Sequence, residues 1–353
     1  MHTRLHTVAL AAVASLACVA GASAQAPAAA KADDKAAQTQ PAAPADTRPA
    51  TTTAFGDTGL WYVPTAEVLA NGQFSASGYR STMNFVQGLT NVADFVGTAA
   101  VGVGNRVELF GGIVADRRID RDIRPFFTAN AGAGGAIYQY PFLATGWTGD
   151  NVGDLYIGGK FNLASEFNRA PAAFALRAMV KAPTGSADKG VGTGKPDVIF
   201  DAIVSKDLNK AEVSGYAGFI ARAQPSGATI PNGVRWGAGL ALMPHQPLHI
   251  TAELHGETPT SSTMTLGSVL TGSDNSRSAL TYDAVALTTA TVGATWQARN
   301  GFFVGAGLNL NFPTKDRASV SITDTDVIGD YVDYQFRIGF HPGTRRYVAP
   351  VSY

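Results

Sequence analysis

The stretch FFVGAGLNLNF, residues 302–312, decides the fold class of this chain. Taken alternately from Phe302, its letters read Phe, Val, Ala, Leu, Leu, Phe, and those from Phe303 read Phe, Gly, Gly, Asn, Asn. A period of two is the signature of a β-strand, because successive side chains of a strand point to opposite faces. The stretch therefore predicts a strand with one apolar face and one small, polar face.

The same alternation recurs along the chain beyond residue 72. It is clear at 155–163, 174–182, 198–204, 248–257 and 332–340. Each repeat fits a tilted membrane-crossing strand of about 9–11 residues with an overhang. We predict twelve strands, at about 73–83, 93–103, 106–116, 152–164, 171–183, 197–207, 211–223, 233–242, 248–258, 283–298, 302–314 and 331–341.

The connections between these strands alternate between short and long. The short ones are 104–105, 165–170, 208–210, 243–247 and 299–301, and the last contains Asn300-Gly301, a pair typical of tight hairpins. Short turns on one side and long loops on the other are typical of outer-membrane barrels. We therefore predict an all-β fold, a transmembrane antiparallel up-and-down β-barrel of about 12 strands with short periplasmic turns and long extracellular loops.

A soluble β-sandwich is the competing architecture. Its apolar faces would point inward and its outer faces would carry many charges. Here the polar faces are rich in Gly, Ser, Thr and Asn, and only 15% of all residues are charged, against about 25% in ordinary soluble domains. This composition favours a barrel with lipid outside and a polar lumen. No apolar run after the N-terminal region is long enough for a membrane-spanning helix.

The N-terminal region predicts export. Residues 1–24 combine a basic start, an apolar core and Ala22-Ser23-Ala24, which fits a cleaved signal peptide. Cys18, the chain's one cysteine, lies within it, so the remainder has no thiol for a disulfide or metal. Residues 25–53 are rich in Ala and Pro and are expected to be disordered. Residues 54–353 then form the barrel.

Several stretches resemble a known family. They are GDTGLWYVPTAEVLANGQFSASGYR (56–80), GVGNRVELFGGI (102–113), RRIDRDIRPFF (117–127) and KGVGTGKPDVIFDAIVSKDLN (189–209). The chain resembles here the N-terminal β-barrel domain of OmpA-like outer-membrane proteins. Members often continue into a C-terminal peptidoglycan-binding domain. Because 13 residues follow Phe340, we expect no such domain.

Two further resemblances concern biogenesis and transport. The alternating aromatic and apolar residues of 332–340 resemble the C-terminal signal that the barrel-assembly machinery reads, although HPGTRRYVAPVSY follows them. The resemblance implies that this machinery is a partner. The loop KAPTGSADKGVGTGKPD (181–197) resembles outer-membrane transporters of hydrophobic compounds.

Chemical motifs are weak. The run from Gly190 to Lys195 fails as a phosphate loop, because Lys189 stands where the first Gly belongs and Pro196 where Ser or Thr should be. His249 and His255 lie about 20 Å apart on one strand, too far to share a metal ion unaided. An outer-membrane phospholipase with lipid-facing Ser and His is an alternative, but our register turns both histidines inward. We expect no enzyme, no cofactor and no metal.

Charged residues on the inward faces are the candidate pore lining. In a narrow lumen, opposite charges either pair and plug the barrel or lie on opposite walls and orient passing solutes. A lumen of twelve strands lies between filled and open barrels, so width alone does not decide. The main candidates are Lys160, Arg177, Lys181, Asp201, Arg235, Glu253, His255 and Arg337.

The longest predicted loop, 117–151, is a candidate constriction. It begins with a dense run of charges and then becomes rich in Gly and aromatic residues. Either it folds inward and narrows the pore, or it forms an external lid paired to its own charges. The candidate residues are Arg117, Arg118, Asp120, Arg121, Asp122 and Arg124.

We interpret the chain as an outer-membrane protein of a Gram-negative envelope and as a porin-like channel for small solutes. A structural barrel with little transport and a transporter of hydrophobic compounds are the alternatives. Expected partners are outer-membrane lipid and lipopolysaccharide, the assembly machinery and small solutes. With 27 basic and 27 acidic residues, the net charge gives no sign of nucleic-acid binding. Residues 54–72, with Trp61-Tyr62, either pack under the barrel or cap its periplasmic mouth.

Overall fold

The computed structural model describes residues 51–85, 90–121, 124–128, 135–312 and 332–341. All of them belong to one compact unit, Arg48–Thr344. Among these residues, no helix is both long and apolar enough to span a bilayer.

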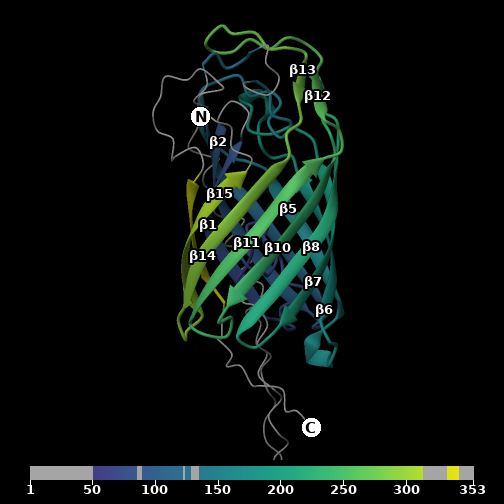
Figure 1. The fold of residues 1–353 in the computed structure, drawn as a ribbon, viewed down its shortest axis with the longest axis vertical. Coiled ribbons are helices and arrows are strands. Elements are labelled where there is room, and N and C mark those ends of the chain that lie inside the picture. Colours follow the sequence, from purple (N-terminus) through teal and green to yellow (C-terminus); the bar gives the residue numbers. More distant parts are fainter. Residues whose placement is uncertain (1–50, 86–89, 122–123, 129–134, 313–331, 342–353) are drawn as a thin grey trace, which may run out of the picture. The chain divides into compact units, whose positions relative to one another are not determined.

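Twelve antiparallel strands, counted over the described residues, close into a barrel (Figure 1). Closure is complete because β1 pairs with β2 on one side and with β16 on the other, while β2 continues to β3. The predicted fold class is confirmed. The barrel strands are β1 (Phe74–Phe85), β2 (Thr90–Val103), β3 (Val107–Arg121), β5 (Leu155–Ala164), β6 (Ala173–Ala182), β7 (Asp197–Asp207), β8 (Ala211–Arg222), β10 (Gly233–Leu242), β11 (Leu248–Pro259), β14 (Leu287–Gln297), β15 (Phe302–Phe312) and β16 (Val332–Phe340).

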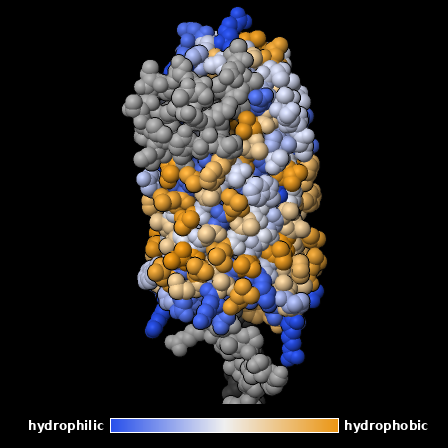
Figure 2. Space-filling model, in the orientation of Figure 1, coloured by the Kyte–Doolittle hydropathy of each residue, from blue (hydrophilic) through white to orange (hydrophobic). Residues whose placement is uncertain are grey.

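The two faces of the wall differ as the alternation predicts. On β15, Leu308 is 47% exposed whereas its neighbour Asn309 is 1% exposed. Figure 2 shows hydrophobic residues spread over the wall and hydrophilic ones concentrated towards the two ends of the barrel. Soluble monomers rarely expose so large an apolar surface. An apolar outside around a polar inside is the arrangement of a membrane-spanning barrel.

The connections on one side of the barrel carry small elements of their own. β9 (Ala228–Thr229), β12 (Thr263–Leu266) and β13 (Thr281–Asp283) form a separate three-stranded sheet. Consequently the tenth barrel strand starts at Leu287 and not at 283. Two short 3-10 helices, Glu166–Asn168 and Ala187–Lys189, and β4 (Trp147–Asn151) complete the regular structure of the described ranges.

Residues 51–72 enter the barrel and are mostly buried there up to Leu69, while Asn71 and Gly72 are exposed beside the turn at Asn105. We call residues 51–72 the plug segment. Isolated bridges between Thr52 and Thr58 and between Gly59 and Pro64 fold this segment into a compact loop. Trp61 at its centre is fully buried. Neither position expected for residues 54–72, under the barrel or at its periplasmic mouth, is the one observed. Thr51, Thr52 and Thr53, which belong to the stretch expected to be disordered, are buried here. A lumen of twelve strands has room for the segment because wall side chains alone fill only narrower barrels.

Candidate functional site: the plugged lumen

The carboxylate of Glu253 binds residues 60–63, which we call the tip of the plug segment. Glu253 points inward from β11 and accepts three consecutive backbone hydrogen bonds, from the N–H groups of Trp61 (2.8 Å), Tyr62 (2.9 Å) and Val63 (2.8 Å). Hydrogen bonds to an ionised acceptor are shorter and stronger than neutral ones. One side chain of the wall therefore binds the backbone of the tip.

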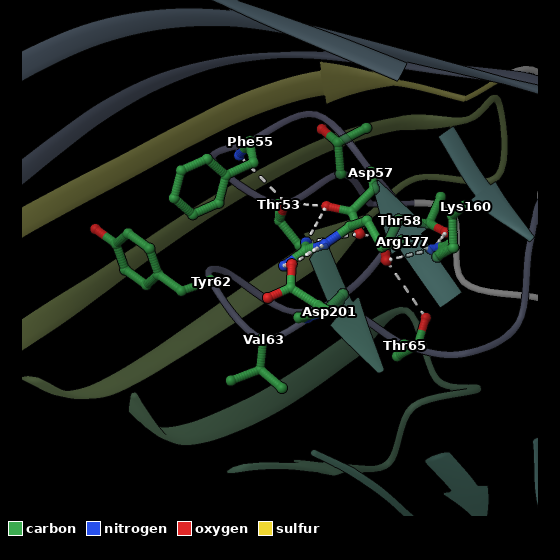
Figure 3. A network of polar contacts seen from close by, with 12 residues as sticks. Thr53, Phe55, Asp57, Thr58, Tyr62, Val63, Thr65, Lys160, Arg177 and Asp201 are labelled. Carbon is green, nitrogen blue, oxygen red and sulfur yellow. Dashed lines mark hydrogen bonds and ion pairs between the residues drawn. The ribbon is translucent and has the colours of Figure 1, made fainter. Parts of the chain in front are cut away.

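A buried ion network joins the plug segment to β6 and β7 (Figure 3). It extends to β10 through Arg235. Arg177 Nη1 lies 3.0 Å from Asp57 Oδ1 in the segment, and Arg177 Nη2 lies 2.7 Å from Asp201 Oδ2 on the wall. Asp201 also pairs with Arg235 at 3.1 Å. Arg177 and Asp57 are fully buried, so their pairing with each other, with Asp201 and with Lys160 compensates their desolvation.

Lys160 and Glu108 form a second anchor, on β5 and β3. Their side chains pair at 3.1 Å. Lys160 Nζ also donates to the carbonyl of Thr58 (3.0 Å), and Glu108 accepts from the backbone N–H and hydroxyl of Thr58 (2.7 Å each) and from the N–H of Leu69 (3.0 Å). Both ends of the plug segment's central loop are thus tied to this pair.

Two further wall residues contact the aromatic pair of the tip. Arg337 on β16 lies over the ring of Trp61, 4.2 Å from its centroid, and donates to the carbonyl of Leu60 (2.6 Å). His255 stacks on Tyr62, with ring centroids 4.4 Å apart. The tip is therefore enclosed between β11 and β16.

The structure places all eight candidate lining residues inside the barrel, but not in either arrangement that the sequence suggested. The charges neither pair across an empty lumen nor segregate on opposite walls. Lys181 pairs with Asp197 of the neighbouring strand at 2.6 Å, as Arg177 does with Asp201. Other candidate residues, such as Glu253, Lys160 and Arg337, form hydrogen bonds with the plug segment. The sequence did not predict that this segment lies in the lumen.

The candidate constriction residues require a correction. Arg117, Arg118, Asp120 and Arg121 do not open a loop, because β3 continues to Arg121. The extension pairs with the start of β2 at Thr90 across a register shift at Phe95 and Val96, and with β4. The shift interrupts the simple alternation, so sequence periodicity ended the strand too early. Asp122 lies outside the described residues.

These residues still organise the connection that follows. Inward-facing Arg117 pairs with Asp94 at 2.6 Å, whereas Arg118 and Asp120 are exposed. Arg121 is fully buried and donates to the carbonyls of Leu143 (3.2 Å), Phe126 (2.7 Å) and Gly135 (3.0 Å). Arg124 donates in turn to the carbonyl of Arg121 (2.5 Å). Arg121 thus fixes the fold of the loop.

The loop forms part of an apolar cap with the connections around β9, β12 and β13. The hydroxyl of Tyr138 donates to Glu257 (3.1 Å), which pairs with Arg222 at 2.7 Å and so ties the cap to the wall. Burial raises the pKa of the Tyr138 hydroxyl, which keeps it a donor. The cap cluster consists of Phe126, Phe127, Ala136, Tyr138, Ala228, Ile230, Met264, Leu266, Tyr282 and Ala284.

Glycines in the wall make room for the plug segment, and one of them provides a test. A Cβ atom on Gly293 of β14 would overlap the indole of Trp61. We expect Gly293→Val to displace the tip without changing any charge and to increase channel openings in a planar bilayer. The outward-facing variant Val292→Ala is the matched control. Unchanged openings in a folded Gly293→Val barrel would contradict the packing described.

Within the described ranges, no cluster of three or more His, Cys, Asp or Glu is placed to hold a metal ion. His255 is committed to its stack with Tyr62, and His249 lies six residues away along β11.

No known family model and no curated protein sequence matches the chain. Solved structures similar to it include an outer membrane channel from Pseudomonas putida F1, with a TM-score of 0.48, 14% identity, and coverage of 78% of this chain and 97% of that one. A deletion mutant of the TodX monoaromatic hydrocarbon channel has a TM-score of 0.38 and 10% identity, and the match covers 83% of this chain and 96% of that one. OmpF of Salmonella typhi has a TM-score of 0.33 and 10% identity, with coverage of 76% of this chain and 96% of that one. Because these TM-scores are below 0.5, the fold assignment rests on the strand order of this chain.

Proposed function

We propose that this protein is an outer-membrane channel for small solutes whose lumen is closed by its own plug segment. The single observation that carries the proposal is the polar attachment of residues 51–72 inside a closed barrel. A chain segment occupies the space that a solute would cross, and it is bound by hydrogen bonds and ion pairs that water can replace. Opening then requires this segment to shift.

The width of the barrel supports a channel over a solid structural element. Eight strands leave an interior that wall side chains fill, whereas twelve here enclose a folded loop with Trp61 at its centre. Displacing that loop exposes a lumen lined with charged and polar groups, such as Arg177 and Glu253. Polar linings are typical of water-filled barrels.

The proposal includes the cellular setting of the barrel. The exposed apolar wall suits outer-membrane lipid, with lipopolysaccharide in the outer leaflet. Residues 1–24 would serve as the export signal and the assembly machinery would insert the barrel. The OmpA-like resemblance of residues 56–257 belongs to the same proposal. We assign the chain no catalytic role.

Removing the plug segment tests the proposal. We compare the chain that begins at Gln25 with a variant that lacks residues 25–72, both refolded and checked by heat-modifiable migration. The channel predicts occasional openings for the first and steady conductance for the second. A folded variant without the segment that stays silent would favour the structural barrel, the main alternative.

A further inference from the structure

The inner wall has two chemically different parts. The wall from β3 to β11 carries the ion pairs described above together with inward apolar side chains such as Ile199 and Ile203. In contrast, the inward residues of β1, β14 and β15 carry no charge within the described ranges, and β16 adds Asp333 and Arg337. The lumen is therefore asymmetric, and we call the strands β14, β15, β16 and β1 the neutral wall.

Hydroxyl and amide side chains on the neutral wall form two successive hydrogen-bonded rungs, which we call the ladder. Thr291 donates to Asn309 (2.6 Å) on the next strand, and Thr289 donates to Asn311 (3.0 Å) one step further along. Asn311 donates to Asp333 (3.1 Å). All five side chains are at most 5% exposed. The ladder presents hydrogen-bonding groups with one carboxylate, Asp333, which has no ion-pair partner among the described residues. Arg337 lies on the same strand and donates to Thr295 and to the carbonyl of Leu60.

The plug segment already satisfies one rung of this ladder with a hydroxyl. Asn309 donates from its side-chain amide to the phenol oxygen of Tyr62 (3.1 Å). Tyr62 thus offers the neutral wall an apolar ring and a hydroxyl, the two surfaces that a sugar ring also presents. If the segment moves, Asn309 loses this partner and becomes available to a solute hydroxyl.

Gln335 provides a second, independent observation on the neutral wall. Gln335 on β16 is fully buried, and neither its amide nitrogen nor its amide oxygen has a hydrogen-bond partner among the described residues. Leaving a buried polar group unsatisfied is unfavourable. Gln335 lies opposite Gly307 of β15, which has no side chain that could form a hydrogen bond with it. In the closed state this wall therefore has an unused donor and an unused acceptor on Gln335, and a solute hydroxyl group can bind both.

We propose that the neutral wall is the solute-contacting face of the opened lumen and that it selects small uncharged solutes rich in hydroxyl groups over ions. This inference rests on the proposed channel function. The ion pairs of the opposite wall serve mainly to hold the plug segment.

The test uses the full chain from Gln25 with matched variants on the two walls. Thr291→Asp puts a charge on the neutral wall, and Ser214→Asp puts the same charge at a buried inward hydroxyl of β8. Reversal potentials in a salt gradient are expected to show a several-fold rise in cation over anion permeability for Thr291→Asp and a smaller one for Ser214→Asp. The reverse order, or no change in either, would overturn the assignment.

A second measurement covers variants that fail to fold with a new charge. Liposome swelling compares glucose with its anionic counterpart gluconate in the unsubstituted chain, Thr291→Val and Ser214→Val. We expect faster swelling in glucose, slowed several-fold by Thr291→Val alone. Equal rates for both solutes, or slowing by Ser214→Val instead, would contradict the inference while leaving the channel intact. Absence of conductance and swelling in every folded variant would instead contradict the channel itself.

Discussion

Replacing Glu253 by alanine is expected to convert brief openings of the barrel into long ones. The substitution leaves three backbone N–H groups of the plug tip without their acceptor. A hydrogen bond to a charged group contributes about 1.5–3 kcal/mol. Because about 1.4 kcal/mol corresponds to a tenfold change in an equilibrium, losing even one of them raises the open fraction at least tenfold. Single-channel recording measures this directly.

The controls for this prediction are neighbours on the same strand. Leu254→Ala removes a lipid-facing side chain, 44% exposed, and leaves the openings as they are. Glu253→Gln keeps the shape and one carbonyl acceptor, so its effect is intermediate. An open fraction for Glu253→Ala that matches that of Leu254→Ala would show that the carboxylate does not hold the plug.

Replacing Arg177 by leucine is expected to destabilise the folded barrel. The change leaves Asp57 without its guanidinium partner and leaves Asp201 with Arg235 alone. Removing one partner of a buried ion pair costs about 3–5 kcal/mol, because the other charge stays desolvated. The midpoint of urea unfolding in lipid vesicles measures the loss.

A double variant separates the buried charge from lost packing. Combining Arg177→Leu with Asp57→Asn removes the carboxylate, which would otherwise be paired only at a longer distance with Lys160 (3.8 Å), and is expected to restore part of the stability. Leu176→Ala, on the lipid face of β6, serves as the outward control. If the Arg177→Leu barrel unfolds at the same urea concentration as the unsubstituted one, the network contributes little to stability.

The wall could be predicted from the sequence because lipid and lumen impose a strict alternation. The two faces of β15 follow directly from the alternation in residues 302–312. The same alternation in β6 and β11 predicts that Arg177 and Glu253 point inward. The prediction failed where this constraint is broken. The predicted end of β3 is five residues too early, since the extra residue Ala115 of β3, opposite Phe95 and Val96, shifts the alternation within β3.

The plug segment could not be placed by the same reasoning. Residues 51–72 have no period, because each side chain meets a different part of the lumen. Their partners lie far along the chain, as Trp61 and Glu253 show. One signal was present in the sequence: the inward residues include both charges in need of partners and several glycines, such as Gly239 and Gly293, that leave space. Together these features indicate an occupant but not its identity.

A reversible cross-link between the plug and the wall tests the central claim most directly. The hydroxyl of Thr52 lies 2.7 Å from that of Ser77 on β1, and the chain after Cys18 has no cysteine. A Thr52→Cys/Ser77→Cys variant therefore forms one disulfide that fixes the start of the segment to β1, and the end of the segment already continues into β1. We predict that the oxidised barrel stays silent in a planar bilayer and that adding a reductant restores its openings. Equal openings before and after reduction would show that solutes pass with the segment in place, and the account would be wrong.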